Sequence, residues 1–399
     1  MFGLLVTALL VCRDCPYQTI GAAVAAAAPG DRIEVQAGTY RETVDVDKPL
    51  VLVGSGAVLD GEGMRPMMHI RADNVRVEGF RFVRSGRDIL ADTAALRVSR
   101  AKHCVVAKNQ FWDNFFAIYL EDAEQCRIEE NIVEGVPRGE GGSGNGIHAW
   151  NSAHVAFVGN QVRGHRDGIY LEFTRASVIE ANDASENIRY GLHFMYSDDN
   201  RFTHNRFWRN GAGVAVMYSH RVEMERNWFA EQQGPATYGL LLKEISDSTV
   251  ACNRFEQNSV GVHMDQSNRN GIRGNDFAHN GLALSLWGSA ERNRFEANTF
   301  RGNLFDVYTN TTSSGNNSFA NNYFAAYTGY DRDRDGKGDL PFRPVSYSAV
   351  LLARYPLAGL LVKSLFFELL DTAERLIPAF APVELGDPSP SLRPIDCAN

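Results

Sequence analysis

The stretch that decides the fold runs from Arg189 to Asn200 and reads RYGLHFMYSDDN. A glycine is followed by alternating apolar residues, and the segment then ends in polar residues. Short alternating stretches that end in polar turns are typical of β-strands rather than helices. The pattern recurs in NGIHAW from Asn145, DGIYLEF from Asp167, AGVAVMY from Ala212, YGLLLKE from Tyr238 and VGVHMDQ from Val260.

Asparagine forms a second repeat along the chain. Of 28 asparagines, 26 fall between Asn109 and Asn322. On the pattern Asn-x-apolar, successive asparagines are 22 to 29 residues apart. They are Asn109, Asn131, Asn160, Asn182, Asn205, Asn227, Asn253, Asn275, Asn298 and Asn322. This period indicates a solenoid. A leucine-rich repeat has a similar period, but its Leu-x-x-Leu-x-Leu pattern is absent.

A coil of about 22 residues fits a parallel β-helix, in which short strands stack about 4.8 Å apart. We expect an all-β, right-handed parallel β-helix of about a dozen coils over residues 16–345. The asparagine amides should hydrogen-bond from coil to coil. An alanine-rich helix from Ile20 to Ala28 should cap the open end. The net charge of −8 argues against a nucleic-acid partner.

Residues 1–15 resemble an export leader, because Met1–Val11 is almost wholly apolar and too short to span a bilayer. Cys12 follows Leu-Leu-Val, which partly matches a lipoprotein processing site. Cys12 and Cys15 form a CxxC motif, which is used for metal binding or redox chemistry but also occurs incidentally.

Of the other four cysteines, two have related positions in the repeat. Cys104 and Cys126 each lie five residues before a repeat asparagine, so they should stack on adjacent coils. A pair of buried thiols and a disulfide both fit that placement. Cys252 and Cys397 have no evident partner.

Two rows of side chains should point outward from the glycine-containing strands. The first row is Tyr119, His148, Tyr170, His193, Ala215, Leu241 and His263, and the second is Glu121, Trp150, Glu172, Met195, Met217, Lys243 and Asp265. We expect His193, Met195, Met217 and Glu172 to be neighbours, with His148 and His263 as outlying candidates. Thioether and imidazole ligands suit Cu(I). The alternative is an apolar patch that binds a protein or lies under a loop.

A calcium-type loop is predicted at residues 331–339, which read DRDRDGKGD. Asp331, Asp333 and Asp335 occupy alternate positions, a glycine is sixth, and Asp339 follows. Phe342 stands where the usual glutamate would be, so the site would be weakened or completed differently. The alternative is a plain acidic turn.

An amphipathic helix is expected over residues 346–380. Between residues 357 and 377 the charged side chains share one arc, and Leu365, Phe366, Leu369 and Leu376 lie on the apolar side. The helix could pack on the solenoid as a lid, lie on a membrane surface or dock on a membrane partner. We favour docking. The proline-rich residues 381–399 should be a flexible tail.

Many β-helices are polysaccharide lyases or mannuronan epimerases, so an enzymatic function is the alternative hypothesis. His165, Arg166, Asp167 and Glu172 are the candidates for such chemistry. The carboxylates are scattered singly, however, and the Asp-Pro-His-Asp stretch of epimerases is absent. A passive binding or adhesion solenoid is a further alternative.

The central coils resemble those of the NosD family. The resemblance is carried by NGIHAWNS (Asn145–Ser152), GHRDGIYLEF (Gly164–Phe173), RYGLHFMYSDDN (Arg189–Asn200) and NGAGVAVMYS (Asn210–Ser219), by APGDRIEV, GTY, VDKPLVLVG and VLDG near the start, and by DRDGKGDLPFRP near the end. It covers residues 28–344.

The resemblance implies a non-enzymatic periplasmic accessory protein, membrane-associated through an ABC transporter. Its expected partners are the permease and ATPase subunits, a copper chaperone lipoprotein and nitrous oxide reductase. Its expected role is Cu(I) transfer for assembly of the reductase's copper centres in denitrification. The C-terminal segment is similar to the one that the family uses against the transporter's membrane subunit.

Overall fold

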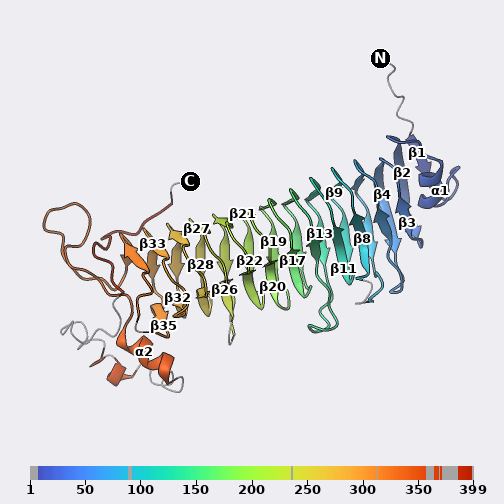
Figure 1. Cartoon of the computed structure of the whole chain (residues 1–399). Coiled ribbons are helices and arrows are strands. Elements are labelled where there is room, and N and C mark those ends of the chain that lie inside the picture. Colours follow the sequence, from blue (N-terminus) through green and yellow to red (C-terminus); the bar gives the residue numbers. More distant parts are fainter. Residues whose placement is uncertain are drawn as a thin grey trace, which may run out of the picture. The chain divides into compact units, whose positions relative to one another are not determined.

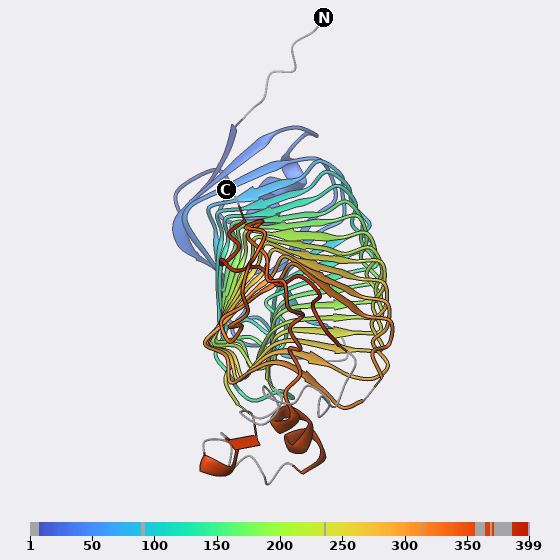
Figure 2. The ribbon, with the colours of Figure 1, turned by 90° about the vertical axis from the view of Figure 1, so that its left-hand side faces the viewer.

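The computed structural model describes residues 8–88, 92–234, 237–311, 313–355, 364–367, 369–370 and 385–397. The fold is an all-β, right-handed parallel β-helix of about 14 turns, so the predicted class is confirmed. The chain divides into two compact units, Met1–Arg206 and Phe207–Asn399. Within each unit the coils stack in parallel (Figures 1 and 2).

Each regular coil contributes one long strand to a first sheet and two three-residue strands to a second sheet. In the first unit, the first sheet contains β3 (Val44–Val46), β5 (Met68–Ile70), β8 (Ala94–Ser99), β11 (Phe116–Glu121), β14 (Ile147–Trp150), β17 (Asp167–Glu172) and β20 (Tyr190–Met195). The second sheet contains β1 (Ala8–Val11), β2 (Arg32–Tyr40), β4 (Val51–Asp60), β6 (Arg76–Glu78), β7 (Arg81–Val83), β9 (Val105–Ala107), β10 (Gln110–Trp112), β12 (Arg127–Glu129), β13 (Ile132–Glu134), β15 (Ala156–Val158), β16 (Gln161–Arg163), β18 (Val178–Glu180), β19 (Asp183–Ser185) and β21 (Arg201–Thr203).

The second unit repeats the same arrangement, and β22 (Arg206–Trp208) contains the boundary. Its first-sheet strands are β23 (Ala212–Met217), β26 (Tyr238–Lys243), β29 (Val260–Asp265), β32 (Leu282–Leu286) and β35 (Phe305–Thr309). Its second-sheet strands are β24 (Glu223–Glu225), β25 (Trp228–Ala230), β27 (Thr249–Ala251), β28 (Arg254–Glu256), β30 (Gly271–Arg273), β31 (Asp276–Ala278), β33 (Arg294–Glu296), β34 (Thr299–Arg301), β36 (Ser318–Ala320) and β37 (Tyr323–Phe324).

The predicted asparagine ladder is confirmed. Asn131, for example, accepts from the backbone N–H and the side-chain amide of Asn109, at 3.0 and 3.2 Å, and donates to Asn160 at 3.0 Å. The same bonds join Asn253, Asn275 and Asn298 in the second unit. Each amide thus satisfies a buried N–H at a corner where the strand ladder is interrupted, which removes the cost of leaving that group unpaired.

Two further polar ladders follow the other corners, and they were not predicted from the sequence. One includes Asn258, Asn280 and Asn303, and another includes Asn270, Asn293 and Asn317. The period is the same as for the first ladder, but other polar residues replace asparagine in several coils. Gln232, for example, occupies a position of the first of these ladders. The six asparagines themselves fit the Asn-x-apolar pattern, so the sequence carried a signal for these ladders, although residues such as Gln232 interrupt it.

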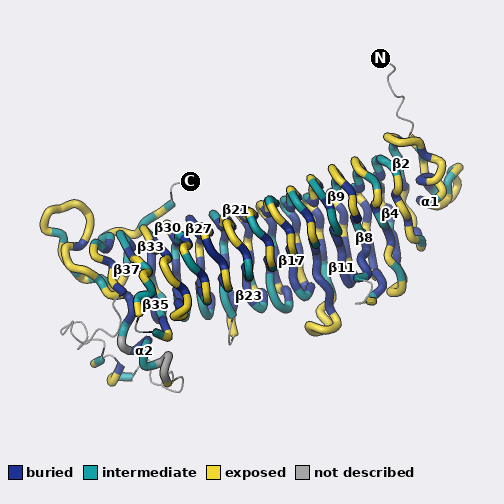
Figure 3. The backbone as a smooth tube through the Cα atoms, viewed as in Figure 1, coloured by how far each residue is buried: buried dark blue, intermediate teal, exposed yellow. Residues whose placement is uncertain are grey.

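Phenylalanine fills the interior of the second unit. The rings of Phe229, Phe255, Phe277 and Phe300 stack on successive coils with centroids 4.6 to 5.0 Å apart. All four are fully buried, and burial of such a side chain stabilises the fold by about 1.5–3 kcal/mol. Figure 3 shows the buried interior beside exposed turns.

The N-terminal part differs from the predicted leader in one respect. Strand β1 pairs with β2, Val11 is fully buried, and Cys12 and Cys15 form a disulfide, so residues 8–15 belong to the folded structure. The export role of residues 1–15 stays a prediction. The cap helix is α1 (Ile20–Ala26), whose first backbone N–H groups donate to the Glu42 carboxylate at 2.9 Å.

The helix expected over residues 346–380 begins where it was predicted, but it is not continuous. Helix α2 (Tyr347–Arg354) packs on β35 and ends before Pro356. A proline disfavours the helical conformation of the residue before it, here Tyr355, and cannot donate the next hydrogen bond. Residues 365–367 and 369–370 are helical again. The rest of 356–384 lies outside the described residues. No helix among the described residues is long and apolar enough to cross a membrane.

The flexible tail expected over residues 381–399 is also wrong for residues 385–397. Asp387 accepts from the backbone and side-chain amides of Asn322, at 2.8 and 2.9 Å, and so continues the asparagine ladder by one position. Ile395 donates to Thr299, and Cys397 forms a disulfide with Cys252. Proline content alone suggested flexibility, whereas these specific contacts order the segment.

The remaining cysteine alternative is resolved. Cys104 and Cys126 are free, buried thiols on adjacent coils, and the Cys104 backbone N–H lies 3.4 Å from the Cys126 sulfur. They are therefore stacked rather than bridged.

Candidate metal centre

A column of four rings runs across the first sheet of the first unit. Tyr119, His148, Tyr170 and His193 are direct partners on β11, β14, β17 and β20, as the predicted row required. Successive ring centroids lie 4.8, 4.6 and 4.5 Å apart, and the last two pairs are stacked. Parallel pairing in register brings every coil's ring onto its neighbour.

These four side chains are more buried than an outward row suggests. Each is only 4–8% exposed. His148, Tyr170 and His193 stack face to face, and Tyr119 meets His148 edge-on. Phe116 packs against both Tyr119 and His148. Solvent or a ligand can therefore reach only the edges of this column.

His193 is held by a buried carboxylate. Its Nδ1 lies 3.2 Å from the Asp167 carboxylate, which also accepts two hydrogen bonds from Arg189, at 2.8 and 2.5 Å. Burial alone would raise the pKa of Asp167, but the bonds from Arg189 and His193 lower it to about 2. The ionised carboxylate favours a proton on Nδ1. Nε2 of His193 has no hydrogen-bond partner among the described residues.

Met195 lies next to this histidine on the same face of β20. Its sulfur is 3.6 Å from the Tyr170 hydroxyl, and the side chain is partly exposed. Asp167 pairs in register with Tyr190, which precedes His193 on β20. Met195 follows His193 on the same strand. The imidazole therefore lies between a carboxylate that orients it and a thioether. Orientation of a ligating histidine by a carboxylate is a general feature of metal sites.

His148 and Glu172 form a second contact on the column. Glu172 Oε2 lies 3.8 Å from His148 Nε2, which is beyond hydrogen-bond distance. Within the described part of the chain, neither ring nitrogen of His148 has a hydrogen-bond partner. Burial lowers the pKa of His148, which favours the neutral imidazole. The neighbouring His148 lowers the pKa of Glu172, which favours the carboxylate. The pair therefore offers one nitrogen and one oxygen donor.

Met217 and His263 belong to the second unit and are described there alone. Met217 lies at the end of β23, in register with Lys243. His263 is 6% exposed, its Nδ1 is 3.0 Å from the Ser285 hydroxyl, and its ring meets Trp287 edge-on. Their membership of a shared copper site stays a prediction.

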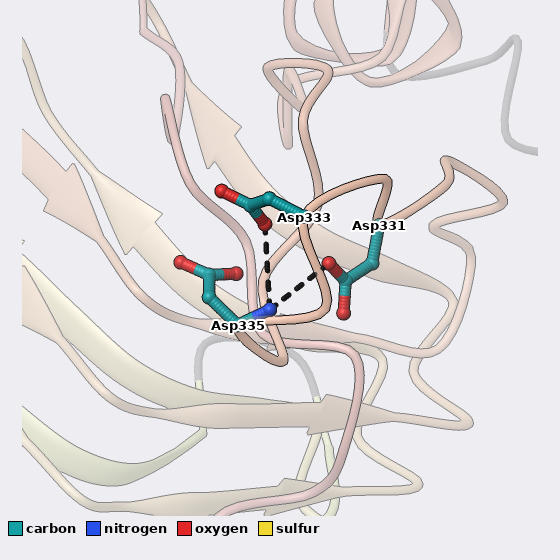
Figure 4. A group of neighbouring side chains, drawn as sticks. All are labelled: Asp331, Asp333 and Asp335. Carbon is teal, nitrogen blue, oxygen red and sulfur yellow. Dashed lines mark hydrogen bonds between the residues drawn. The ribbon is translucent and has the colours of Figure 1, made fainter.

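The predicted calcium loop brings three carboxylates together. Ligand oxygens of Asp331, Asp333 and Asp335 all lie within 4.8 Å of one another (Figure 4). Asp331 and Asp333 accept from the backbone N–H of Asp335. Asp339 instead accepts from the Arg332 backbone at 2.7 Å, which ties the two ends of the loop.

Sequence reasoning had placed Asp167 in the enzymatic alternative and had not considered Arg189. A signal was present, because Arg189 lies 22 residues after Asp167, which is one coil length. That spacing puts oppositely charged residues on adjacent coils. The bond between Asp167 and His193, however, depends on side-chain conformations that spacing cannot specify.

The comparisons with known proteins place this chain in a family. A model described as "Periplasmic copper-binding protein (NosD)" matches residues 134–330, and a model of a protein of unknown function, DUF1565, matches residues 11–227. The "Probable ABC transporter binding protein NosD" of Pseudomonas aeruginosa is 31% identical over 92% of this chain and 89% of its own length. The protein of that name from Stutzerimonas stutzeri is 27% identical over 91% and 87%.

The fold makes the chain a parallel β-helix protein. The chain belongs to the NosD family.

Solved structures share the fold at low identity. The catalytic unit of a GH87 α-1,3-glucanase from Streptomyces thermodiastaticus has a TM-score of 0.58 and 14% identity, covering 75% of this chain and 63% of its own. XylC in complex with xylose has a TM-score of 0.56 and 12% identity, covering 79% and 84%. These likenesses show the β-helix fold alone.

Proposed function

We propose that this chain is a non-enzymatic, periplasmic copper-binding accessory protein of an ABC transporter. In this proposal it supports copper delivery to nitrous oxide reductase, with a copper chaperone lipoprotein as donor. The family model's copper-binding description and the relatives' transporter-binding names support the coarse assignment. The individual partners and the reductase role follow from the family resemblance.

The observation that carries the copper proposal is the His193–Asp167 pair beside Met195. The histidine is 4% exposed, its Nδ1 faces a carboxylate, and none of the described residues hydrogen-bonds to its Nε2. A buried nitrogen without a hydrogen bond destabilises the fold, so its presence is expected to serve a function such as ligand binding. Imidazole and thioether donors together fit Cu(I). We assign His193 and Met195 as its ligands in the first unit.

The enzymatic alternative is less compatible with the burial of its candidates. Asp167 is fully buried and bonded to Arg189, and His165 is 2% exposed. Neither can contact a polymer on the surface. Of that set, Arg166 and Glu172 alone are partly exposed. Incubation with alginate and polygalacturonate, followed by assays for unsaturated or shortened products, should therefore show no turnover.

The test of the copper proposal is a His193→Ala, Met195→Ala double variant. Cu(I) affinity is measured anaerobically by competition with a chromogenic chelator. Loss of two ligands should weaken binding by at least the order of 10–100-fold, the range known even for outer ligand-shell changes. His154→Ala, Met64→Ala is the matched control, since both residues are exposed in the same unit. Unchanged affinity and unchanged reductase loading would contradict the assignment.

The segment after α2 is proposed to dock on the transporter's membrane subunit or the adjacent membrane surface. Leu365, Phe366 and Leu369 are 72%, 59% and 60% exposed, so the predicted apolar side chains are available to a partner. Leu376 lies outside the described residues. Replacing the first three with serine should release the protein from the transporter in co-purification. Tyr330→Ser, Leu340→Ser is a control with comparable exposure, and retained binding in the triple variant would refute docking.

The Asp331–Asp335 loop is proposed to bind Ca²⁺. Three carboxylates and the Gly336 turn resemble the first half of a calcium loop. Backbone carbonyls or water would supply the remaining ligands.

A further inference from the structure

His148 carries the least satisfied polar side chain of the ring column. It is 7% exposed, and no residue that the structure describes hydrogen-bonds to its Nδ1 or Nε2. A buried polar group that is left without a hydrogen-bond partner destabilises the fold. The rings of Phe116, Tyr119 and Tyr170 pack against it, and its charged neighbour Glu172 lies 3.8 Å from Nε2. The unpaired nitrogens of the His148 imidazole are therefore available to bind a ligand.

Glu172 lies where a second ligand to a metal ion bound by His148 would be. The 3.8 Å between His148 Nε2 and Glu172 Oε2 is too long for a hydrogen bond. Metal–nitrogen and metal–oxygen bonds of about 2.0–2.2 Å place two donors on one ion about 3–4 Å apart. The Glu172 side chain is 28% exposed, so an ion and its water ligands can reach the pair from solvent.

This position is separate from that of His193. The Tyr170 ring lies between the two histidines, with its centroid 4.6 Å from His148 and 4.5 Å from His193. Two strand spacings separate β14 from β20, which is about 9–10 Å. One ion with bonds of about 2 Å cannot contact both rings. The column therefore has room for two ions rather than one shared site.

The two positions differ in ligand chemistry. His193 and Met195 offer nitrogen and sulfur, whereas His148 and Glu172 offer nitrogen and a harder, negatively charged oxygen. Imidazole with carboxylate suits divalent copper or zinc better than Cu(I). We propose that His148 and Glu172 form a second metal position, selective for a divalent transition-metal ion. The inference rests on the proposed function in that it takes His193 and Met195 as the separate Cu(I) position.

The test uses the full chain with Cu²⁺ as the probe. His148→Phe keeps a ring in the stack and removes both nitrogens, and Glu172→Gln keeps the size of an exposed side chain. Each should weaken Cu²⁺ binding by the order of 10–100-fold. The nitrogen coupling in the electron paramagnetic resonance spectrum of bound Cu²⁺ should disappear in H148F. The Cu(I) affinity of both variants should stay near that of wild type.

The reciprocal pair is His193→Phe and Met195→Leu, which should weaken Cu(I) binding and leave Cu²⁺ binding intact. Wild-type Cu²⁺ affinity and spectra in both H148F and E172Q would overturn the inference. Equal loss of both ions in every variant would also overturn it, because it would indicate one shared site. If H193F and M195L keep full Cu(I) affinity while H148F loses Cu²⁺, the proposed Cu(I) site fails and the divalent position stands.

Discussion

At the scale of single residues, the burial of His165 makes the stability of the solenoid depend on pH. His165 is 2% exposed, and its Nε2 has no hydrogen-bond partner in the part of the chain that the structure describes. Burial lowers its pKa to about 4. In the unfolded chain the pKa of a histidine is near 6.5. The folded state therefore binds this proton less readily than the unfolded state, and acid should weaken the fold through this residue.

The lowered pKa of His165 predicts that the protein becomes less stable as the pH falls. His165 contributes stability that is fully present above about pH 6.5 and is lost as the pH falls towards 4. The loss from this residue should be about 3 kcal/mol. In His165→Gln, urea unfolding followed at pH 7, 5.5 and 4 should therefore show a flatter decline than wild type. Exposed His154→Gln is the control, and equal slopes in H165Q and wild type would show that His165 is not responsible.

At the scale of elements, polar ladders determine where the solenoid ends. Asp387 receives hydrogen bonds from the Asn321 backbone and from two groups of Asn322, at 3.1, 2.8 and 2.9 Å. It is fully buried and stands where another coil would supply an asparagine. An aspartate suits this terminal place, because it only has to accept.

Asp387→Ala should lower the free energy of unfolding by about 2–4 kcal/mol, since it leaves buried N–H groups without acceptors. Asp387→Asn should cost less, because one oxygen remains. Denaturant titration measures both values. Exposed Asp396→Ala should change stability by less than about 0.5 kcal/mol. An equally small effect of D387A would show that the ladder end does not need this cap.

The acidic loop gives a prediction about ligand binding. If Asp331, Asp333 and Asp335 hold Ca²⁺, millimolar Ca²⁺ should slow proteolysis within residues 331–339 of the wild-type protein. The Asp331→Asn, Asp333→Asn double variant should lose this protection. Mg²⁺ is the control ion, because its smaller octahedral shell fits such a loop less well. Protection that persists in the variant would place any calcium elsewhere.

At the scale of the whole molecule, disulfides close loops of very different length. Cys252–Cys397 spans 145 residues, whereas Cys12–Cys15 spans 3. The longer bond ties the C-terminal segment to a coil of the second unit, and the apolar segment after α2 lies within the closed loop. The chain thus returns to the solenoid after the proposed docking residues.

Loop length leads to a ranked prediction. By chain entropy, removal of Cys252–Cys397 by a double serine variant should cost about 5 kcal/mol and removal of Cys12–Cys15 about 2 kcal/mol. Thermal and urea unfolding measure both. Limited proteolysis with mass spectrometry should show new cleavage within residues 385–397 only in the first variant. If the two variants lost equal unfolding free energy, or if residues 385–397 stayed protected from cleavage in the first variant, the noncovalent contacts at Asp387 and Ile395 would be sufficient to hold this segment in place.

Part of the candidate site was predictable and part was not. The glycine repeat correctly aligned His148, Tyr170 and His193 on neighbouring strands, because parallel register follows directly from coil length. Their burial was not predictable, since it arises when rings on adjacent coils cover one another. The division of the histidines by Tyr170 likewise depends on how the rings stack.

The period of the sequence was enough to predict the β-helix and its asparagine ladder without coordinates, whereas the family was indicated by the resemblance of its central motifs. Position i and position i + 22 must meet wherever coils are uniform. Contacts that interrupt this period needed the tertiary structure. The Cys252–Cys397 disulfide, the Asp387 cap and the Asp167–His193 bond depend on loop paths and side-chain conformations, which no local repeat specifies.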